Sequence, residues 1–338
     1  MGLLSFGTWH ISQPAATLGH QLAQFDYNCA MNKSNRLKGG LYGLLIGDAL
    51  GVPYEFHPAS AIPSRDLIDM TPPARFHRAH AMVKPGTWSD DGALALCLLD
   101  SLIEKDGLDL ENLATKFLEW GSNGYLAVDG QAFGIGNQTS RALENLKSGM
   151  SPETAGPSDV RSNGNGSLMR ALPLALWHRG SDEDLVALAH TQSLPTHGHV
   201  HSQVCCALYV LVARRLLEGQ KMNEAWDGAE EGLARLYRDS PFALALEFVL
   251  SLKSQEPKGS GYVVDSLWSA KNACQESTLV GVVKAAIALG DDTDTTACIA
   301  GGLAGIHFGF DSIPLRWMDI LRGRELVKPL EKLLLLRS

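Results

Sequence analysis

Two apolar segments carry glycine at every fourth position. The first segment holds Gly39, Gly43, Gly47 and Gly51, and the second holds Gly301, Gly305 and Gly309. Residues four apart lie on one face of an α-helix, and a glycine inside a helix destabilises it by about 1 kcal/mol relative to alanine. A face built of glycines therefore indicates compensation by close backbone packing. The spacing predicts two buried helices that cross closely and bring residues near 50 and 300 together.

The apolar residues recur with a helical period from residue 36 onward, and no series of alternating strands is found. Predicted helices cover 36–51, 91–105, 109–120, 138–147, 167–178, 197–218, 223–238, 242–253, 263–273, 277–289, 295–309 and 323–336. A chain of 338 residues with 45% hydrophobic content can bury a large core. We therefore predict an all-α fold, a compact orthogonal helical bundle formed by one domain over residues 36–338.

Prolines interrupt the helical pattern between Pro53 and Pro85. Six of them fall in this stretch, and each removes a backbone donor and disfavours a continuous helix. We expect a long loop here, and long loops in compact domains often act as lids.

Residues 1–35 differ from the rest and are interpreted as an N-terminal extension or arm. They contain a single acid, Asp26, and several aromatic residues. Met31 precedes a polar stretch that leads into the first predicted helix, so an overlong gene start is one explanation. The other is a docking arm that binds this protein or a partner.

Charge and composition exclude several classes. A net charge of −8 disfavours nucleic acid as a partner. The six cysteines show no CxxC spacing, which fits a reducing cytoplasm. No secretion signal is found, and the apolar run from Cys298 to Phe310 is too short to cross a bilayer. We expect a cytoplasmic protein without a membrane partner.

Two short clusters place carboxylates and hydroxyls at predicted helix starts. The first is Ser89-Asp90-Asp91-Gly92, and the second is Asp291-Asp292-Thr293-Asp294-Thr295. Capping explains one such side chain in each cluster, but not two or three like charges within a few residues, which repel one another without a cation. Oxygen donors favour Mg²⁺, Mn²⁺ or Ca²⁺.

The spacing rules out a calcium EF-hand, because the twelfth residue counted from Asp292 is Leu303 instead of glutamate. Two clusters could hold two metal ions that polarise substrate oxygens and activate water. Glu55 begins the proline-rich loop. It is either a solvated acid or a group that takes a proton from attacking water.

Two glycine-rich segments could hold the rest of a ligand. In residues 133–139, Gly134, Ile135, Gly136 and Asn137 precede a predicted helix whose start could receive a diphosphate. No strand precedes them, so a Rossmann fingerprint is excluded. His197 and His201 are four apart, but the zinc-peptidase motif lacks its glutamate, which leaves a structural or ligand-contacting histidine as the alternatives.

Four segments together resemble the ADP-ribosylglycohydrolases, the family of dinitrogenase-reductase-activating glycohydrolase. They are Gly-Asp-Ala-Leu-Gly-x-Pro-x-Glu at 47–55, Ser-Asp-Asp at 89–91, Asn-Gly-Ser-Leu-Met-Arg at 165–170 and Asp-Thr-Asp-Thr at 292–295. The resemblance implies an all-α enzyme with two Mg²⁺ ions, or Mn²⁺, that hydrolyses the glycosidic bond between ADP-ribose and a modified protein side chain, most often arginine.

The same resemblance implies the residues of the site. The metal ligands would be Ser89, Asp90, Asp91, Asp292, Asp294 and Thr295, and the catalytic residues would include Glu55, Asp90 and Asp91. Substrate would contact Gly134, Ile135, Gly136, Asn137, Asn165, Gly166, Ser167, Met169 and His197. Gly134 stands where some arginine-directed members carry an aspartate, which leaves the linkage open.

Two other functions stay open at this point. An immunity protein could bind an ADP-ribosyltransferase toxin through residues 1–35, with or without hydrolysis. A dinuclear-metal phosphohydrolase acting on nucleotides would use the same acids and would release phosphate instead of ADP-ribose.

Overall fold

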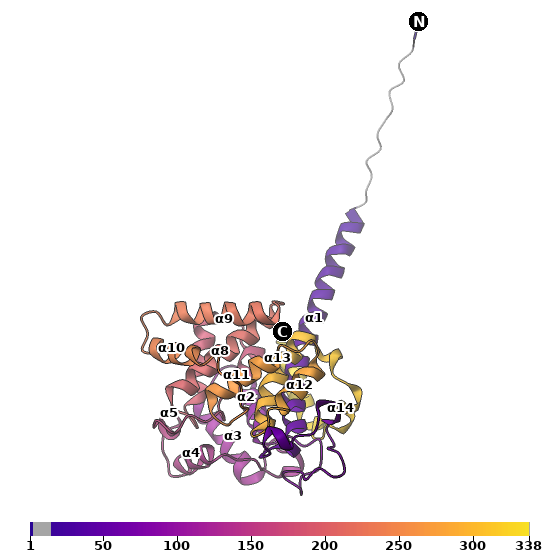
Figure 1. Ribbon diagram of the computed structural model, residues 1–338. Helices are drawn as coiled ribbons and strands as arrows, with labels where there is room; N and C mark the ends of the chain where they lie inside the picture. The colour runs from indigo at the N-terminus through magenta and orange to yellow at the C-terminus, as the bar shows by residue number, and fades with distance from the viewer. Residues whose placement is uncertain (3–14, 338) are drawn as a thin grey trace.

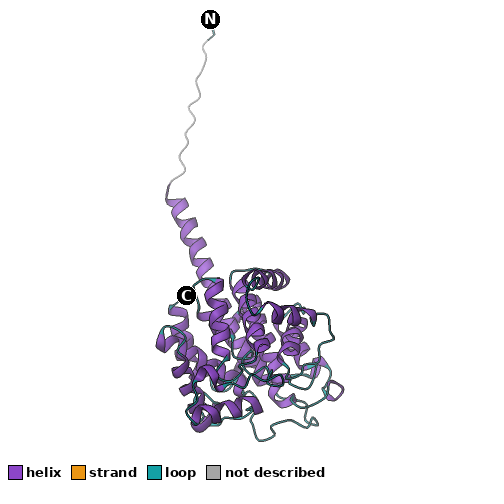
Figure 2. Cartoon of the chain, turned by 90° about the vertical axis from the view of Figure 1, so that its left-hand side faces the viewer, coloured by secondary structure: helices purple, strands orange, loops and turns teal. Residues whose placement is uncertain are grey.

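The computed structural model describes residues 1–2 and 15–337, and their side chains from residue 33 onward besides the first two. The described chain is built of α-helices and short 3₁₀ turns, without a strand (Figures 1 and 2). The α-helices are α1 (Ala15–Gly51), α2 (Asp90–Lys105), α3 (Leu110–Asn123), α4 (Asn137–Lys147), α5 (Pro152–Ala155), α6 (Leu172–Trp177), α7 (Asp182–Ser193), α8 (Val200–Leu217), α9 (Met222–Leu236), α10 (Ala243–Ser251), α11 (Val263–Ala273), α12 (Leu279–Ile287), α13 (Thr293–Phe308), α14 (Leu315–Ile320) and α15 (Arg324–Leu336). The predicted all-α class is confirmed.

Helices α1 and α13 pack against each other along their glycine faces. A β-carbon added to Gly305 would lie 1.9 Å from the carbonyl oxygen of Gly39, and one added to Gly43 would lie 2.3 Å from that of Gly301. No side chain fits at these points. The predicted close crossing is confirmed, and it places the C-terminal end of α1 beside the N-terminal end of α13, where Gly51 touches the backbone of Asp294.

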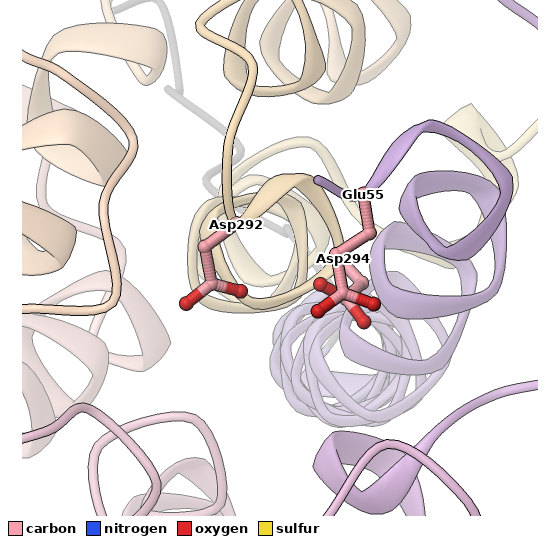
Figure 3. A group of neighbouring side chains, drawn as sticks. All are labelled: Glu55, Asp292 and Asp294. Carbon is pink, nitrogen blue, oxygen red and sulfur yellow. The ribbon is translucent and has the colours of Figure 1, made fainter. Parts of the chain in front are cut away.

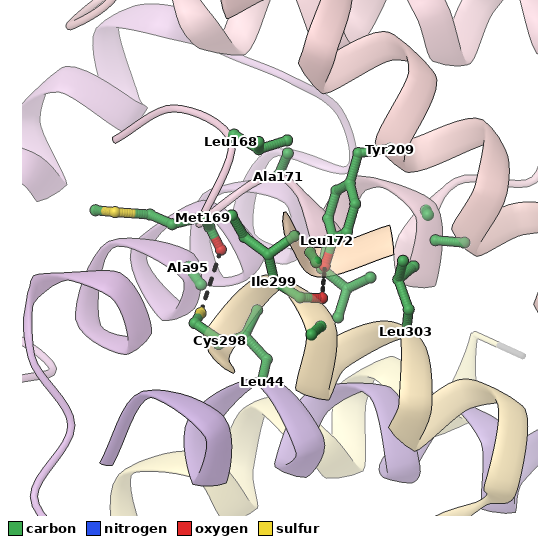
Figure 4. Close-up of a cluster of buried hydrophobic side chains, with 14 of the residues drawn as sticks. Leu44, Ala95, Leu168, Met169, Ala171, Leu172, Tyr209, Cys298, Ile299 and Leu303 are labelled. Carbon is green, nitrogen blue, oxygen red and sulfur yellow. Dashed lines mark hydrogen bonds between the residues drawn. The ribbon is translucent and has the colours of Figure 1, made fainter. Parts of the chain in front are cut away.

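The other face of α13 packs into the apolar core. Figure 4 shows Leu44 of α1 below Cys298 and Ile299 of α13, with α8 above. Tyr209 of α8 donates a hydrogen bond to the carbonyl of Ile299 over 3.1 Å. Since α13 is buried between α1 and this layer, its first residues are fixed in position.

Helix α8 is the one described helix that is long and apolar enough to cross a membrane, and 72% of it is buried inside the protein. Buried core helices commonly have this composition. The length and hydropathy of α8 are therefore weak evidence for a membrane span.

Several predicted helix boundaries or assignments were wrong, and the short helices α5 and α14 were not predicted. Helix α1 begins at Ala15 instead of residue 36, within the predicted arm; residues 3–14 lie outside the described part of the chain. The predicted helix 167–178 is reduced to α6, because Pro173 suits only the first turn of a helix. Helix α7 was missed, although Ser181 and Asp184 form a capping box at its start.

The proline-rich stretch contains no α-helix, as predicted. It holds 3₁₀ turns at Val52–Tyr54, Ala59–Ala61 and Arg65–Leu67. The N–H of Phe56 donates to the carbonyl of Asp291 over 2.7 Å, and the N–H of Asp291 donates to the carbonyl of His57 over 2.7 Å. These two hydrogen bonds attach the loop directly to the start of α13.

Candidate metal centre

A buried carboxylate of α1 accepts hydrogen bonds from the backbone at the start of α2. Asp48 is fully buried, and its carboxylate accepts the N–H of Ser89 at 2.9 Å and the N–H of Gly92 at 2.7 Å. Ser89 is the N-cap of α2, and its hydroxyl accepts the N–H of Asp91 over 3.2 Å. Three N–H groups at the start of α2 are therefore satisfied by Asp48 and Ser89, so the carboxylates of Asp90 and Asp91 are not needed as caps.

Asp48 was quoted in the sequence motif at 47–55 without a role. Its position within the first predicted helix, among apolar residues, was a usable indication, because a carboxylate in an apolar interior requires donors that satisfy it. Burial raises the pKa of Asp48 to about 7, although the hydrogen bonds from Ser89 and Gly92 act in the opposite direction.

The start of α13 is held in a different way. Asp292 is the N-cap by position but makes no side-chain cap. Its carboxylate instead accepts the side-chain amide of Asn165 over 2.7 Å. The hydroxyl of Thr293 donates to the carbonyl of Gly51 over 2.8 Å and so closes the end of α1. The carboxylates of Asp292 and Asp294 are thereby left facing the end of α1.

Both helix starts and the loop acid converge. Oxygen atoms of Glu55, Asp292 and Asp294 lie within 4.8 Å of one another. Figure 3 shows the carboxylates of Glu55 and Asp294 meeting, with that of Asp292 alongside. The hydroxyl of Thr295 donates to Asp91 Oδ1 over 3.3 Å, which joins the α13 cluster to the α2 cluster.

The electrostatics of this pocket favour a bound cation. Burial and mutual repulsion raise the pKa values of Asp90, Asp91 and Asp294 well above the ordinary aspartate range. The second oxygen of Asp91 is buried without a hydrogen-bond partner. Buried polar atoms are normally satisfied. A hard divalent cation would supply the missing partner and compensate the clustered charge, so the residues present fit the predicted metal site.

His80 is a second residue that sequence analysis did not identify. Its Nε2 lies 2.6 Å from Glu55 Oε2, and both side chains are largely buried. Burial raises the pKa of Glu55, while the contact with His80 opposes that rise. A histidine inside a long irregular loop gave no pattern that could have revealed this contact.

The first glycine-rich segment lies against the acids. Gly134 has a φ of +85°, and an added β-carbon would lie 2.5 Å from Asp90 Oδ1. Gly136, the N-cap of α4, makes no side-chain cap, so the N–H groups at the start of α4 are not occupied by a capping side chain. Ile135 and Asn137 are exposed beside it. This arrangement suits the predicted diphosphate subsite, which stays a prediction.

The second glycine-rich segment connects Asp292 to His197. Besides binding Asp292, the Asn165 amide donates to the hydroxyl of Ser266 over 2.9 Å. A β-carbon on Gly166 would lie 3.1 Å from His197 Nε2, so glycine leaves room for the imidazole. Burial and nearby Arg170 lower the pKa of His197 well below its ordinary value, which keeps the ring neutral.

A buried guanidinium fixes the orientation of that imidazole. Arg170 is fully buried and donates to the hydroxyl of Thr196 over 2.7 Å. The same hydroxyl lies 2.8 Å from His197 Nδ1. Arg170 and Thr196 therefore hold the imidazole from its Nδ1 side, and its Nε2 faces Gly166.

Two predicted substrate contacts lie away from this surface. Ser167 is fully buried and bonds to Ser193 over 2.8 Å, and Met169 lies in the apolar core (Figure 4). His197 precedes α8 and His201 lies within it, so they do not share the helical face that a zinc pair at that spacing requires. His201 instead stacks on Phe248 with ring centroids 4.5 Å apart.

Comparisons with known proteins identify relatives of this chain. The family model described as ADP-ribosylglycohydrolase matches residues 30–338. The chain is 30% identical over 307 residues to ADP-ribosylarginine hydrolase Tri1 of Serratia proteamaculans, covering 88% of this chain and 78% of that protein. It is 32% identical over 287 residues to ADP-ribosylarginine hydrolase Tri1 of Pseudomonas putida, covering 84% and 74%.

A third relative and a solved structure extend the likeness. The chain is 28% identical to ADP-ribosyl-[dinitrogen reductase] glycohydrolase of Rhodospirillum rubrum, covering 89% of this chain and 96% of that protein. A solved structure described as an ADP-ribosylglycohydrolase-related protein complex matches with a TM-score of 0.73 and 29% identity, covering 91% of this chain and 99% of that chain.

Proposed function

Because the chain belongs to the ADP-ribosylglycohydrolase family and is an ADP-ribosyl hydrolase, we propose that it releases ADP-ribose from arginine side chains of modified proteins. The observation that carries the proposal is the convergence of Glu55, Asp292 and Asp294 with the start of α2 in one buried acidic pocket. Two relatives named ADP-ribosylarginine hydrolase support the choice of arginine over other linkages.

The side chains of this pocket suit hydrolysis of a glycosidic bond. Water attacks the anomeric carbon of the ribose, the bond from that carbon to the guanidine nitrogen breaks, and the leaving group takes up a proton. Glu55 would accept the proton that the water loses; burial raises the pKa of its carboxyl, which makes it a stronger base. The contact between His80 Nε2 and Glu55 Oε2 orients that carboxylate.

Two Mg²⁺ ions, or Mn²⁺, are the proposed cofactors. Ser89, Asp90, Asp91, Asp292, Asp294 and Thr295 would hold them. When bound, such ions polarise substrate oxygens and lower the pKa of water. The N–H groups at the start of α4 with His197 Nε2 would receive the rest of ADP-ribose.

The test is release of ADP-ribose from an arginine-modified protein in Mg²⁺, with EDTA as the matched control. Serine-linked ADP-ribose is assayed in parallel to establish the linkage. Products are separated so that free phosphate, which a phosphohydrolase acting on nucleotides would release, is distinguished from ADP-ribose. Metal-dependent release from arginine supports the proposal. No release at high enzyme concentration rejects it.

A second candidate function concerns the N-terminal arm. Helix α1 starts fifteen residues before the family match begins at residue 30, and its first turns project beyond the other helices (Figure 1). We infer that this projection could bind an ADP-ribosyltransferase toxin, as an immunity protein would. Deleting residues 1–29 tests the idea: protection from a co-expressed toxin should fall while hydrolysis is retained. Unchanged protection would exclude a role for the arm.

A further inference from the structure

Phe56 directly follows Glu55 and occupies an unfavourable position. Its φ is +64°, and the residue is 73% exposed. A left-handed backbone is rare for a bulky residue, and an exposed phenyl ring contributes no burial to folding. The hydrogen bonds between this loop and Asp291 keep the backbone in place. Residues with such a strained backbone concentrate at functional sites, where the strained conformation serves binding or catalysis instead of stability.

Two more rings stand beside Phe56. The imidazole of His80 has its centroid 5.6 Å from that of Phe56 and 5.3 Å from that of Phe133. The same imidazole binds Glu55. Phe133 precedes Gly134, which touches Asp90. We call Phe56, His80 and Phe133 the aromatic mouth; it borders Glu55 and lies next to Asp90.

The chemistry of the aromatic mouth suits a planar cation. Aromatic faces attract cations, and arginine most often, because its guanidinium is flat and weakly hydrated. The carboxylate of Glu55, which precedes Phe56 and is not among the proposed metal ligands, has the complementary charge. An arginine carrying ADP-ribose keeps its guanidinium next to the bond that breaks, and Phe56 is adjacent in sequence to the acid proposed to assist that step.

We propose that the aromatic mouth is the subsite for the modified side chain and that the ring of Phe56 stacks on its guanidinium. This inference rests on the proposed function, and it names the residues that would make the enzyme specific for ADP-ribose linked to arginine. An adenine ring would also stack on an aromatic residue, so the experiment separates the two halves of the substrate.

The experiment compares Phe56→Ala, Phe56→Leu and Phe56→Tyr in the full-length chain. None of the three replacements is glycine, so the left-handed backbone is equally unfavourable in all of them. Two quantities are measured with Mg²⁺ present: the KM for an arginine-modified protein, and the inhibition constant of free ADP-ribose. Phe308→Ala is the control, since Phe308 lies at the opposite end of α13 from Asp294. Thermal unfolding checks that each variant is folded.

Phe56→Ala and Phe56→Leu should each raise the KM by about three- to tenfold, the range of a partly exposed cation–π contact. Phe56→Tyr restores the ring and should recover most of that loss. The inhibition constant of ADP-ribose should stay constant throughout, because ADP-ribose lacks the guanidinium. Phe308→Ala should change neither quantity.

Three results overturn the inference. A wild-type KM in Phe56→Leu would mean that apolar bulk suffices and the ring face is irrelevant. A parallel rise in the ADP-ribose inhibition constant would assign Phe56 to the adenosine or diphosphate half. A wild-type enzyme that releases nothing from arginine removes the proposed function, and the subsite with it, before any variant is compared.

Discussion

The starts of α2 and α13 share one pattern in sequence and differ in how the fold supports them. The first turn of α2 rests on the buried Asp48, which accepts two of its N–H groups. The start of α13 has no side-chain cap, and Asp292 reaches sideways to Asn165 of a glycine-rich loop. Asp90 and Asp91 are buried, whereas Asp292 is partly exposed.

The difference assigns different tasks to the two helix starts. The α2 acids are fixed by backbone hydrogen bonds within the core and form a rigid base for a cation. The α13 acids lie against Glu55 and Asn165, both of which belong to loops. In the proposed metal site, α2 would supply the preorganised part and α13 would join it to these loops.

The largest effect should follow loss of one acid from either helix start. Asp90→Asn and Asp294→Asn each remove one proposed metal ligand, so hydrolysis in Mg²⁺ should fall by about a thousandfold or more. Asp291→Asn is the matched control, because Asp291 is exposed and asparagine tolerates its φ of +55°. The rate of ADP-ribose release measures all three. Retention of more than a tenth of the activity in Asp90→Asn would show that Asp90 is not a required metal ligand.

The next largest effect is on the free energy of unfolding, which should fall more when the support of α2 is removed than when that of α13 is removed. Asp48→Ala leaves the N–H groups of Ser89 and Gly92 buried without an acceptor and should destabilise the protein by about 2–5 kcal/mol. Asn165→Ala removes hydrogen bonds to the partly exposed Asp292 and to Ser266 and should destabilise the protein by about 1–2 kcal/mol. Urea denaturation in EDTA measures both changes. Equal losses would show that α2 is no better supported than α13.

Substitution of His80, which contacts Glu55 beside α13, should lower the rate less than loss of a metal ligand does. His80→Ala removes the contact that orients Glu55, and displacement of a catalytic group by about 1 Å lowers rates by up to about a hundredfold. We expect kcat to fall about ten- to a hundredfold with little change in the inhibition constant of ADP-ribose. His80→Gln keeps a donor and should recover part of kcat. A rise in that inhibition constant with unchanged kcat would instead place His80 in ligand binding.

The features that the sequence predicted correctly are those that depend on residues close together in the chain. Glycine at four-residue steps gave the contact between α1 and α13, because only a backbone-to-backbone packing tolerates so many glycines on one face. Acid and hydroxyl pairs at helix starts gave both halves of the acidic pocket. The proline-rich stretch was correctly assigned as non-helical, since proline acts on the residues next to it in sequence.

Sequence did not predict contacts that depend on distant loops. The bond between His80 and Glu55 spans 25 residues of irregular chain, and no periodicity fixes where such a loop returns. Asn165 appeared only as a substrate residue, although it bonds Asp292 across 127 positions. The N-terminal extent of α1 was also missed, because the segment before residue 36 lacks the apolar period that marks the buried part of that helix. The division into an arm and one catalytic domain stays a prediction.

The smallest expected effect concerns pH and metal. Burial raises the pKa of Asp48 to about 7, and burial also raises the pKa values of Glu55, Asp90, Asp91 and Asp294. Between the unfolded value of about 4 and these folded values, the metal-free native state binds more protons than the unfolded chain. Its stability must therefore fall as pH rises through that window.

A divalent cation competes with those protons, so its stabilising effect should grow over the same window. At ten times its dissociation constant the gain is about 1.4 kcal/mol. Denaturation between pH 5 and pH 8, with Mg²⁺ or with EDTA, measures the difference. In Asp90→Asn the difference should shrink, because one ligand is lost while the core is kept. A stabilising effect of Mg²⁺ that is constant with pH would mean that the cation does not bind to the carboxyls whose pKa values are raised. The metal site would then lie outside the acidic pocket.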